Sequence, residues 1–215
     1  RCAARERPLE RVAVPPAPEL PAAPVAPVAP GFFAELRFLG QLDQTYLVCE
    51  AAGELVLIDQ HVAHERVVLH GLRRSATGVA VQRLLFPTDV VLPAELRAVV
   101  QAHGATLARL GFDAIVVGDV VRLAAMPAGL RQDPALVLRD LAEHLGADPA
   151  AARGDRPLAT IACHTAMRAG DPLTAAEAAG LLTAMDAVDF HEPGLHGRPV
   201  LLRLSVAEIG RRFGR

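Results

Sequence analysis

The junction between an apolar strand and a helix constrains this chain more than any other part of its sequence. Residues 45–50 and 55–59 read as strands, and the turn at residues 51–53 between them indicates a β-hairpin. Apolar residues then recur at helical spacing, which predicts a helix from His61 to about Arg74. The polar residues that begin at Asp59 therefore lie where the strand passes directly into the helix.

The remaining globular sequence alternates between strand and helix patterns. Strands are expected at 36–40, 81–86 (ended by Pro87), 112–117, 121–125 and 199–204. Helices are expected at 93–110, 133–145 and 157–169, with two more beginning at the capping boxes Thr174–Glu177 and Ser205–Glu208. This mixture predicts an α/β (α+β) fold. The 52% apolar residues suffice for a core, which excludes a wholly disordered chain.

The first residues differ from the rest of the chain. Eight of the 17 Pro lie within residues 1–30, and Pro at this density favours an extended, solvated backbone. We therefore predict a disordered linker over residues 1–31. Because the chain opens on Arg1, we expect it to be part of a longer protein with another domain upstream.

Charge and cysteine usage narrow the function classes. All 22 basic residues are Arg, and 24 acidic residues give a net charge of −2, so a broadly basic nucleic-acid binder is excluded and any DNA contact must be local. The three Cys have no disulfide spacing, which fits a reducing interior. No apolar run of about 18 residues and no signal peptide is present, so we expect no membrane span.

Side chains after the strand could bind a metal ion. His61 and Glu65 are four residues apart, so they project from one helical face and could share a divalent cation, with Asp59 adding an oxygen. The alternative is a helix N-terminus with ordinary polar residues.

Two further polar clusters lie far along the chain. Cys163 and His164 lie within an apolar helix, and the Gly/Pro-rich loop 191–199 carries His191, His196 and Arg198. The three clusters together contain a mixed set of N, O and S donors that suits Zn²⁺ or a similar ion: Asp59, His61, Glu65, Cys163 and His196. The alternatives are a buried thiol that acts as a small apolar residue and a plain turn.

Four motifs in a fixed order resemble the C-terminal domain of the MutL family of DNA mismatch repair proteins. Asp59–Arg66 is similar to that family's DQHAxxER, Ala162–His164 to its ACR element, His196–Pro199 to the second half of CPHGRP and Phe213–Arg215 to a terminal FxR. The resemblance extends over roughly residues 32–215, including the strand pair that precedes Asp59.

The resemblance implies a two-lobe dimerisation domain. Residues 32–75 and 157–215 would form the dimerisation lobe with the metal motifs, and residues 76–156 an inserted regulatory lobe. It also implies a bacterial cytoplasmic, nucleoid-associated homodimer that contacts DNA weakly by itself. Through the full-length protein, it would meet the mismatch-recognition protein MutS.

The resemblance further implies a latent metal-dependent endonuclease that nicks DNA. His61, Glu65, Cys163 and His196 match the family's ligand positions for Zn²⁺ or Mn²⁺. Asp59 matches a position needed for nicking, and we assign catalytic roles to Asp59, Glu65 and Arg198.

The chain departs from the family pattern at two site positions. His70 replaces a second Glu, and Gly194 replaces a Cys two residues before His196; Val62 and His164 are further departures. The side chains that could serve as auxiliary ligands are His64, His70, His164 and His191. Two alternatives therefore stand beside the nuclease: a platform for dimerisation and clamp docking with a degenerate metal site, and a purely structural zinc site.

A short segment outside the metal motifs indicates another partner. Residues 82–87 are similar to QxLLxP, the peptide with which the MutL family is proposed to bind the β sliding clamp. Extended apolar side chains fill a groove in this type of recognition, while the Gln amide fixes one end. The expected clamp contacts are Gln82, Leu84, Leu85 and Pro87. The alternative is an internal strand closed by a Pro.

Overall fold

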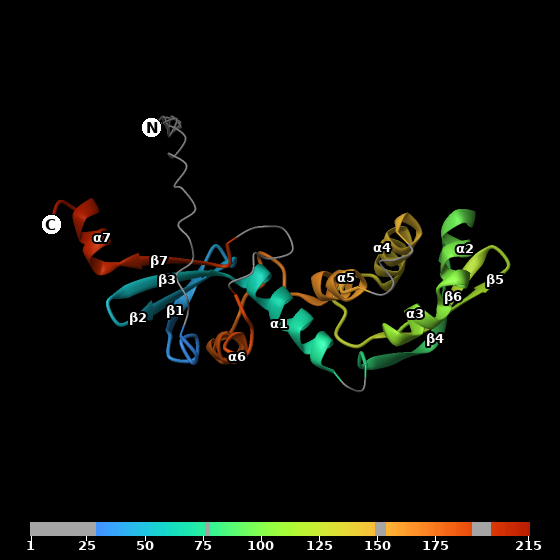
Figure 1. The fold of residues 1–215 in the computed structure, drawn as a ribbon, viewed down its shortest axis with the longest axis horizontal. Helices are drawn as coiled ribbons and strands as arrows, with labels where there is room; N and C mark the ends of the chain where they lie inside the picture. Colours follow the sequence, from blue (N-terminus) through green and yellow to red (C-terminus); the bar gives the residue numbers. More distant parts are fainter. Residues whose placement is uncertain (1–28, 76–77, 149–153, 191–198) are drawn as a thin grey trace, which may run out of the picture.

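The computed structural model describes residues 29–75, 78–148, 154–190 and 199–215. These residues form an elongated α+β molecule with one antiparallel sheet in each half (Figure 1). Helices α1 (Gln60–Arg74) and α5 (Arg156–Thr165) lie between the two halves. The expected fold class is confirmed. The linker predicted over 1–31 lies almost wholly outside the described residues.

The first sheet has four antiparallel strands in the order β1-β2-β3-β7. They are β1 (Arg37–Leu42), β2 (Tyr46–Ala51), β3 (Glu54–Asp59) and β7 (Leu201–Ser205). The hairpin predicted from the sequence is β2 and β3, joined at a turn where Gly53 has φ +79°, a conformation that favours glycine. Strand β7 joins this sheet from the far end of the chain, beside β3.

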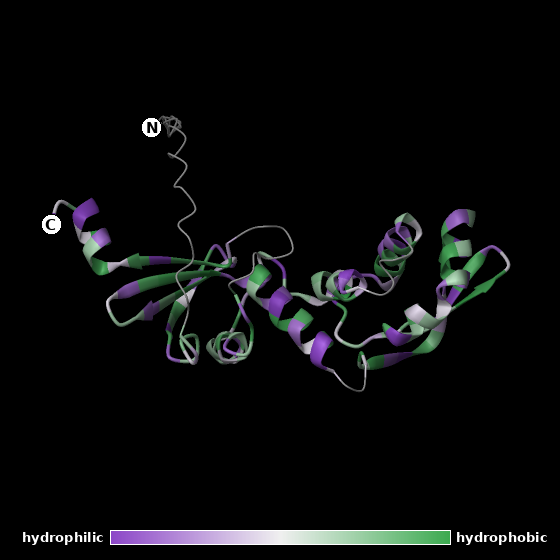
Figure 2. Cartoon of the chain, viewed as in Figure 1, coloured by the Kyte–Doolittle hydropathy of each residue, from purple (hydrophilic) through white to green (hydrophobic). Residues whose placement is uncertain are grey.

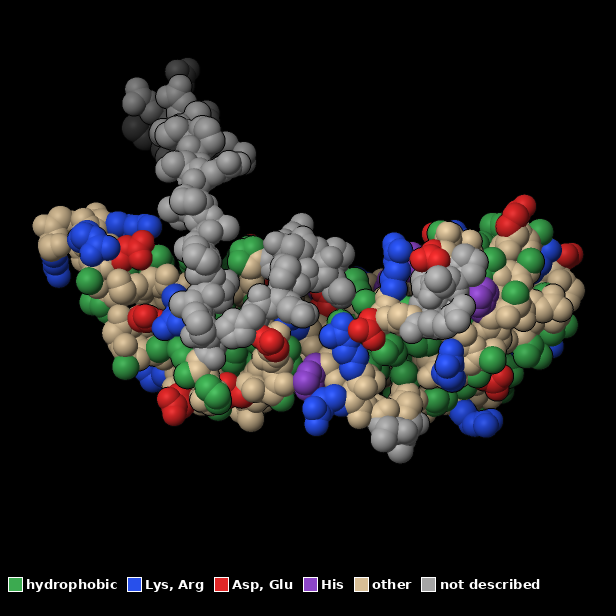
Figure 3. Space-filling view, viewed as in Figure 1, with side chains coloured by type: hydrophobic (Ala, Val, Ile, Leu, Met, Phe, Trp, Pro, Cys, Tyr) green, Lys and Arg blue, Asp and Glu red, His purple; other side chains and the backbone are tan. Residues whose placement is uncertain are grey.

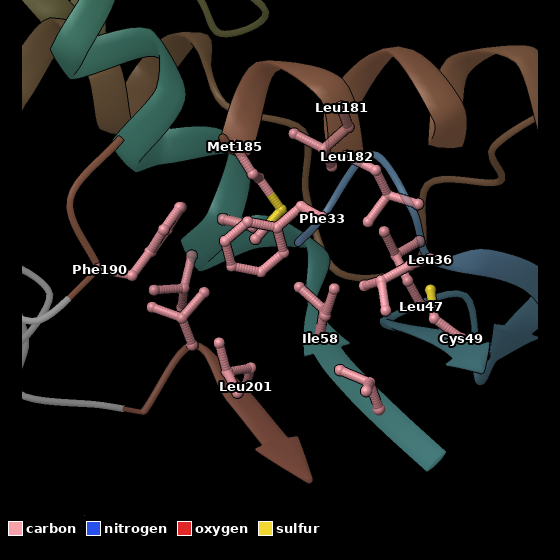
Figure 4. Packing of buried hydrophobic residues seen from close by; sticks show 14 of the residues in the cluster. Phe33, Leu36, Leu47, Cys49, Ile58, Leu181, Leu182, Met185, Phe190 and Leu201 are labelled. Atoms are coloured by element: carbon pink, nitrogen blue, oxygen red, sulfur yellow. The ribbon is translucent and has the colours of Figure 1, made fainter. Parts of the chain in front are cut away.

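One face of the first sheet packs against α1 and α6 (Ala175–Met185) around a core (Figure 4). Alternate strand residues point into this core, as the two-residue period of a strand requires. Its largest members are Phe33, Leu36, Leu47, Ile58, Leu181, Leu182, Met185, Phe190 and Leu201. Cys49 also lies there as a free thiol, and burial raises its pKa to about 11, so this cysteine acts as a packing residue.

The second sheet has three antiparallel strands in the order β4-β6-β5. They are β4 (Val81–Val91), β5 (Asp113–Val117) and β6 (Val120–Pro127). The helices of this half are α2 (Ala94–Ala102), α3 (Gly104–Arg109) and α4 (Pro134–Ala147). Its core is dominated by Leu and Val, together with Phe112.

Helix α5 contributes to both halves of the molecule. Its Ile161 lies in the second core, while Ala159 and Ala162 pack against Leu69 of α1. The lobe boundaries at residues 75 and 157 stay predictions. Strand β7, near residue 205, nevertheless shares one sheet with β1, β2 and β3.

Three expectations for the secondary structure were wrong. The helix expected over 93–110 is broken at His103, whose ψ of 20° ends α2 before Gly104 begins α3. Strand β4 continues through Pro87, because its pairing with β6 is interrupted between Arg83 and Thr88 and no donor is needed there. Helix α5 ends at Thr165, four residues early, because the next residue adopts an extended conformation.

The predicted ends of two other helices are confirmed. Thr174 and Glu177 form the capping box of α6, and the Ser205 hydroxyl accepts the Glu208 N–H at the start of α7 (Val206–Arg212). Among the described residues, no helix has the length and apolarity that crossing a bilayer requires.

Candidate metal centre and interaction surfaces

Asp59 lies at the junction that the sequence singled out, and it caps α1. Its Oδ1 accepts hydrogen bonds from the N–H groups of His61 and Val62, at 3.0 and 3.1 Å. Capping satisfies two backbone donors that the first helical turn leaves unpaired. Within the described residues, Oδ2 has no hydrogen bond. The carboxylate therefore has a structural contact on one oxygen, while the other is free for chemistry.

Gln60 is fully buried and joins three segments of the chain. Its Nε2 donates to the carbonyls of Gln44, Arg168 and Asp171 at 2.8, 3.0 and 3.1 Å. Its Oε1 accepts from Nε2 of Gln41 at 2.5 Å. Both ends of the amide are thus satisfied, as burial of an amide requires. Gln60 thereby fixes the backbone that follows α5 against the start of α1.

Two histidines on α1 bind the backbone of one residue, Met167. His61 Nδ1 lies 2.7 Å from the Met167 carbonyl, which can only accept, so Nδ1 carries the proton and the lone pair of the neutral ring is on Nε2. The Met167 N–H donates to His64 Nδ1 at 3.0 Å. The first contact orients His61 as metal-ligating histidines usually are, with Nε2 available.

His64 serves as a backbone acceptor and not as an auxiliary ligand through Nδ1. Burial, followed by the charges of Arg131 and His61, holds its pKa below the usual value for histidine. A lowered pKa keeps the ring neutral, which the hydrogen bond from Met167 requires, since a protonated ring has no lone pair to accept it.

Glu65 and Cys163 meet between α1 and α5. Glu65 is 2% exposed, and its Oε1 is buried with no hydrogen-bond partner among the described residues. Burial, the Glu65 charge and a hydrogen bond to Glu65 raise the pKa of the Cys163 thiol, with a smaller effect from Asp140. A buried carboxylate oxygen without a partner is costly, and a cation in contact with it would remove that cost.

These donors fit a divalent cation, although the described residues contain only part of a site. A thiolate, a carboxylate and an imidazole are ligands that Zn²⁺ prefers, and the buried Glu65 Oε1 accepts no hydrogen bond from the described residues. Within the described residues, no three His, Cys, Asp or Glu side chains form a group that could hold a metal ion. His61 is thus not brought to Glu65 and Cys163, while His191, His196 and Arg198 lie outside the described residues.

The remaining auxiliary histidines lie apart from one another. Helical geometry places His70 roughly 140° around α1 from Glu65, on another face. His164 is directed to α4, where Nε2 lies 2.9 Å from Asp140 Oδ2, and its Nδ1 is buried without a partner in the described part of the chain. Neither His70 nor His164 therefore joins the Glu65–Cys163 pair in the described part of the chain.

The segment expected to bind the clamp protrudes from β4, an edge strand. Leu85 and Phe86 are 88% and 78% exposed, and they lie where pairing with β6 is interrupted. Gln82 and Pro87 are also exposed, whereas Leu84 is half-buried and packs against the second core. The segment thus presents two large apolar side chains to solvent.

The second face of the first sheet is also apolar. Val48, Leu57 and Leu202 form one row across three strands, and Leu55 pairs with Leu204 beside it. Leu202 is 44% exposed, and Val48, Leu55 and Leu57 are half-buried. Figure 2 shows this apolar character along β3 and β7. A contiguous apolar surface of this kind marks an interface with another molecule.

Sequence reasoning missed the residues that bind backbone groups around the site. Gln60 lay within a recognised motif but had no assigned role, and Gln41, which also donates to a carbonyl, was not singled out. Every residue has a backbone carbonyl, so the sequence does not show which carbonyls these amides bind. The one available signal was an amide at a position that helical spacing places inside the fold.

Comparison with known proteins supports one family. Residues 39–173 match the family described as the MutL C terminal dimerisation domain. This chain is 42% identical over 194 residues to the DNA mismatch repair protein MutL of Anaeromyxobacter dehalogenans strain 2CP-1, and 40% identical over 198 residues to that of Geobacter sulfurreducens. Both matches cover 86% of this chain. The chain therefore belongs to the MutL C-terminal dimerisation domain family, and the resemblance stated above is confirmed.

The chain corresponds to one part of such a protein. The same two matches cover 32% of each relative, so the chain spans about a third of their length. The MutL protein of Geotalea daltonii matches at 38% identity over 93% of this chain and 33% of its own length.

The contacts of Gln60 predict a large effect of its removal. Gln60→Leu keeps the volume but removes the four hydrogen bonds of this buried amide, so the free energy of unfolding should fall by about 3 kcal/mol. Urea denaturation at fixed protein concentration measures this change. The control Gln101→Leu, on the exposed surface of α2, should change stability by less than about 0.5 kcal/mol. Equal effects of the two variants would show that the Gln60 contacts do not stabilise the fold.

Proposed function

We propose that this chain is the homodimerising C-terminal domain of a DNA mismatch repair protein, and that it nicks DNA with a bound divalent metal ion. The observation that most supports nuclease activity is the buried Oε1 of Glu65, which lies beside the Cys163 thiol and has no hydrogen-bond partner among the described residues. A chain without a cation at this position would bury an uncompensated carboxylate oxygen next to a sulfur atom.

The residues that would hold the ion are His61, Glu65, Cys163 and His196. Bound Zn²⁺ or Mn²⁺ would lower the pKa of a coordinated water and polarise the phosphoryl oxygen. The contact of His61 Nδ1 with Met167 supports this assignment, because it directs the proton of the neutral ring to Nδ1 and makes Nε2 the nitrogen that can bind an ion. Since Cys163 must lose its proton to bind the ion, metal binding should strengthen as pH rises.

Asp59 and Arg198 supply the remaining chemistry in this proposal. Asp59 Oδ2 is free of hydrogen bonds within the described residues, so it can accept the proton of the attacking water while Oδ1 still caps α1. Arg198 would stabilise negative charge on the phosphate through its fork of donors.

We propose that a second copy of this chain covers the outer face of the first sheet. The family description names dimerisation, and the row of Val48, Leu57 and Leu202 offers the apolar surface that a homodimer interface needs. The opposite face of the same sheet already packs against α1 and α6.

A docking platform without nuclease activity is the second candidate function. The exposure of Leu85 and Phe86 favours it, because two large apolar side chains on an interrupted edge strand suit insertion into a groove of the β sliding clamp. Docking there would raise the local concentration of DNA around a chain with low net charge. Mismatch recognition through MutS would require the full-length protein, acting at the bacterial nucleoid.

If the chain is a metal-dependent nuclease, Mn²⁺ should support nicking of supercoiled plasmid. Asp59→Asn should then lower the nicking rate at least about 100-fold. Asn caps helices as well as Asp, so the variant should fold normally. Agarose gels follow conversion to open circles, and elemental analysis should show metal in both proteins. The control Asp119→Asn, at an exposed turn, should nick like the parent chain. Equal nicking by Asp59→Asn would reject this role, and absence of nicking with any divalent ion would favour the platform.

The dimer face predicts that Leu202→Arg yields a monomer. The substitution places like charges against each other at the interface, while the exposed site tolerates Arg in the isolated chain. Light scattering after size exclusion should show the mass falling from twice 22.7 kDa to one chain. Leu136→Arg, at a 51% exposed site on α4, should remain dimeric. A dimeric Leu202→Arg variant would place the interface elsewhere.

If residues 82–87 bind the β sliding clamp, replacing Leu85 and Phe86 together by Ser should weaken binding roughly 100-fold. The reason is the loss of two apolar side chains that the complex would bury. Surface plasmon resonance with immobilised clamp measures the affinity. Val91→Ser, at a 73% exposed site further along the same strand, should bind like the parent chain. Unchanged affinity of the double variant would reject this docking site.

A further inference from the structure

The turn at residues 167–171 is fixed on all sides by hydrogen bonds. His61 and His64 bind Met167, and Gln60 binds the carbonyls of Arg168 and Asp171. The Gly170 N–H donates to the Gln44 carbonyl at 2.8 Å, and Gly170 has φ +92°, which favours glycine. The start of α1 and the β1–β2 turn thus hold this exposed turn in one backbone conformation.

The side chain of Asp171 completes this arrangement. Its Oδ2 accepts the backbone N–H of Arg168 at 2.9 Å and Arg131 Nη1 at 2.6 Å. The single carboxylate of the turn is therefore occupied by two donors and is neutralised by Arg131.

Arg168 is the residue that this rigid turn presents to solvent. Both of its backbone polar groups are bound, the N–H by Asp171 and the carbonyl by Gln60. Its side chain is exposed, and no described residue forms an ion pair or hydrogen bond with the guanidinium. Arg168 also directly follows the residue that orients His61. This cation thus lies on a fixed backbone, one residue from Met167, whose carbonyl contacts the proposed metal ligand His61.

The charge of the whole chain makes a local cation important. The net charge is −2, and Figure 3 shows acidic and basic side chains interspersed over the visible face. DNA binding depends strongly on neutralised phosphates, so a chain without a broad basic surface needs individual arginines at the site itself. A guanidinium offers two parallel donors to a phosphate.

We propose that Arg168 contacts a backbone phosphate of the DNA strand held beside His61, and that the 167–171 turn positions this contact. The inference rests on the proposed nuclease function and assigns its substrate contact. A contact of this kind places the strand relative to the metal ligands without reading its sequence. Because the turn is already fixed, little backbone ordering opposes binding.

The salt dependence of DNA affinity tests the contact. Fluorescence anisotropy of a labelled 30-base-pair duplex, titrated with this chain in 50–200 mM KCl without divalent ions, gives the slope of log affinity against log salt. Loss of one phosphate contact in Arg168→Gln should reduce that slope by about 0.9 and weaken binding roughly eightfold at 0.1 M salt. Arg168→Lys keeps the charge and should retain most of the slope.

A matched control is available on the same helix as His61. Arg74→Gln removes an exposed arginine at the last residue of α1, about 20 Å from His61, and should keep the parent slope. With Mn²⁺, Arg168→Gln should lower the nicking rate at low DNA concentration but not at saturating DNA, while Mn²⁺ affinity is unchanged.

The outcomes separate this inference from the nuclease itself. Equal slopes for Arg168→Gln and the parent chain would overturn the phosphate contact even if the parent chain nicks DNA. If no divalent ion supports nicking by the parent chain, the nuclease proposal fails. A reduced slope for Arg168→Gln would then still show the phosphate contact.

Discussion

The arrangement of the candidate site depends on hydrogen bonds from the first turn of α1 to the backbone after α5. Gln60, His61 and His64 bind carbonyls and an N–H more than 100 residues away along the chain. Cys163 lies four residues before Met167, so fixing Met167 also fixes the end of α5 against α1. This brings the thiol to Glu65. The same three residues therefore stabilise the fold and place the ligands.

Electrostatics then gives the Glu65–Cys163 pair its character. Burial of the thiol, and then the neighbouring Glu65 carboxylate, favour its protonated form, which is why the pKa of Cys163 is raised. A cation would reverse this preference, because it stabilises both negative groups at once. The neighbouring His164 is directed away from the pair, because its Nε2 is bonded to Asp140 on α4.

Local sequence signals predicted local structure well. The hairpin β2–β3, the start of α1 and the capping box at Thr174 follow from turn and capping chemistry that acts over a few residues. The placement of His61 and Glu65 on one face of α1 follows from helical geometry. The strand that continues through Pro87 could not be predicted in this way, because the tolerance of proline depends on β4 being an edge strand.

Tertiary contacts account for what the sequence could not show. The break at His103 follows no strong helix-breaking pair, and the early end of α5 reflects the binding of Met167 by two histidines. The partners of Gln60 are backbone groups, which every residue has. Which carbonyls a buried amide reaches depends on the packing of distant segments.

The position of α5 has a consequence for how the molecule comes apart. Ile161 belongs to the second core, while Ala159 and Ala162 pack against α1, which is part of the first half. Neither half can lose its structure without exposing apolar side chains of this shared helix. Slow amide hydrogen exchange should therefore extend without interruption from the first sheet through α5 into α4, and a change in the angle between the halves would act on Cys163 directly.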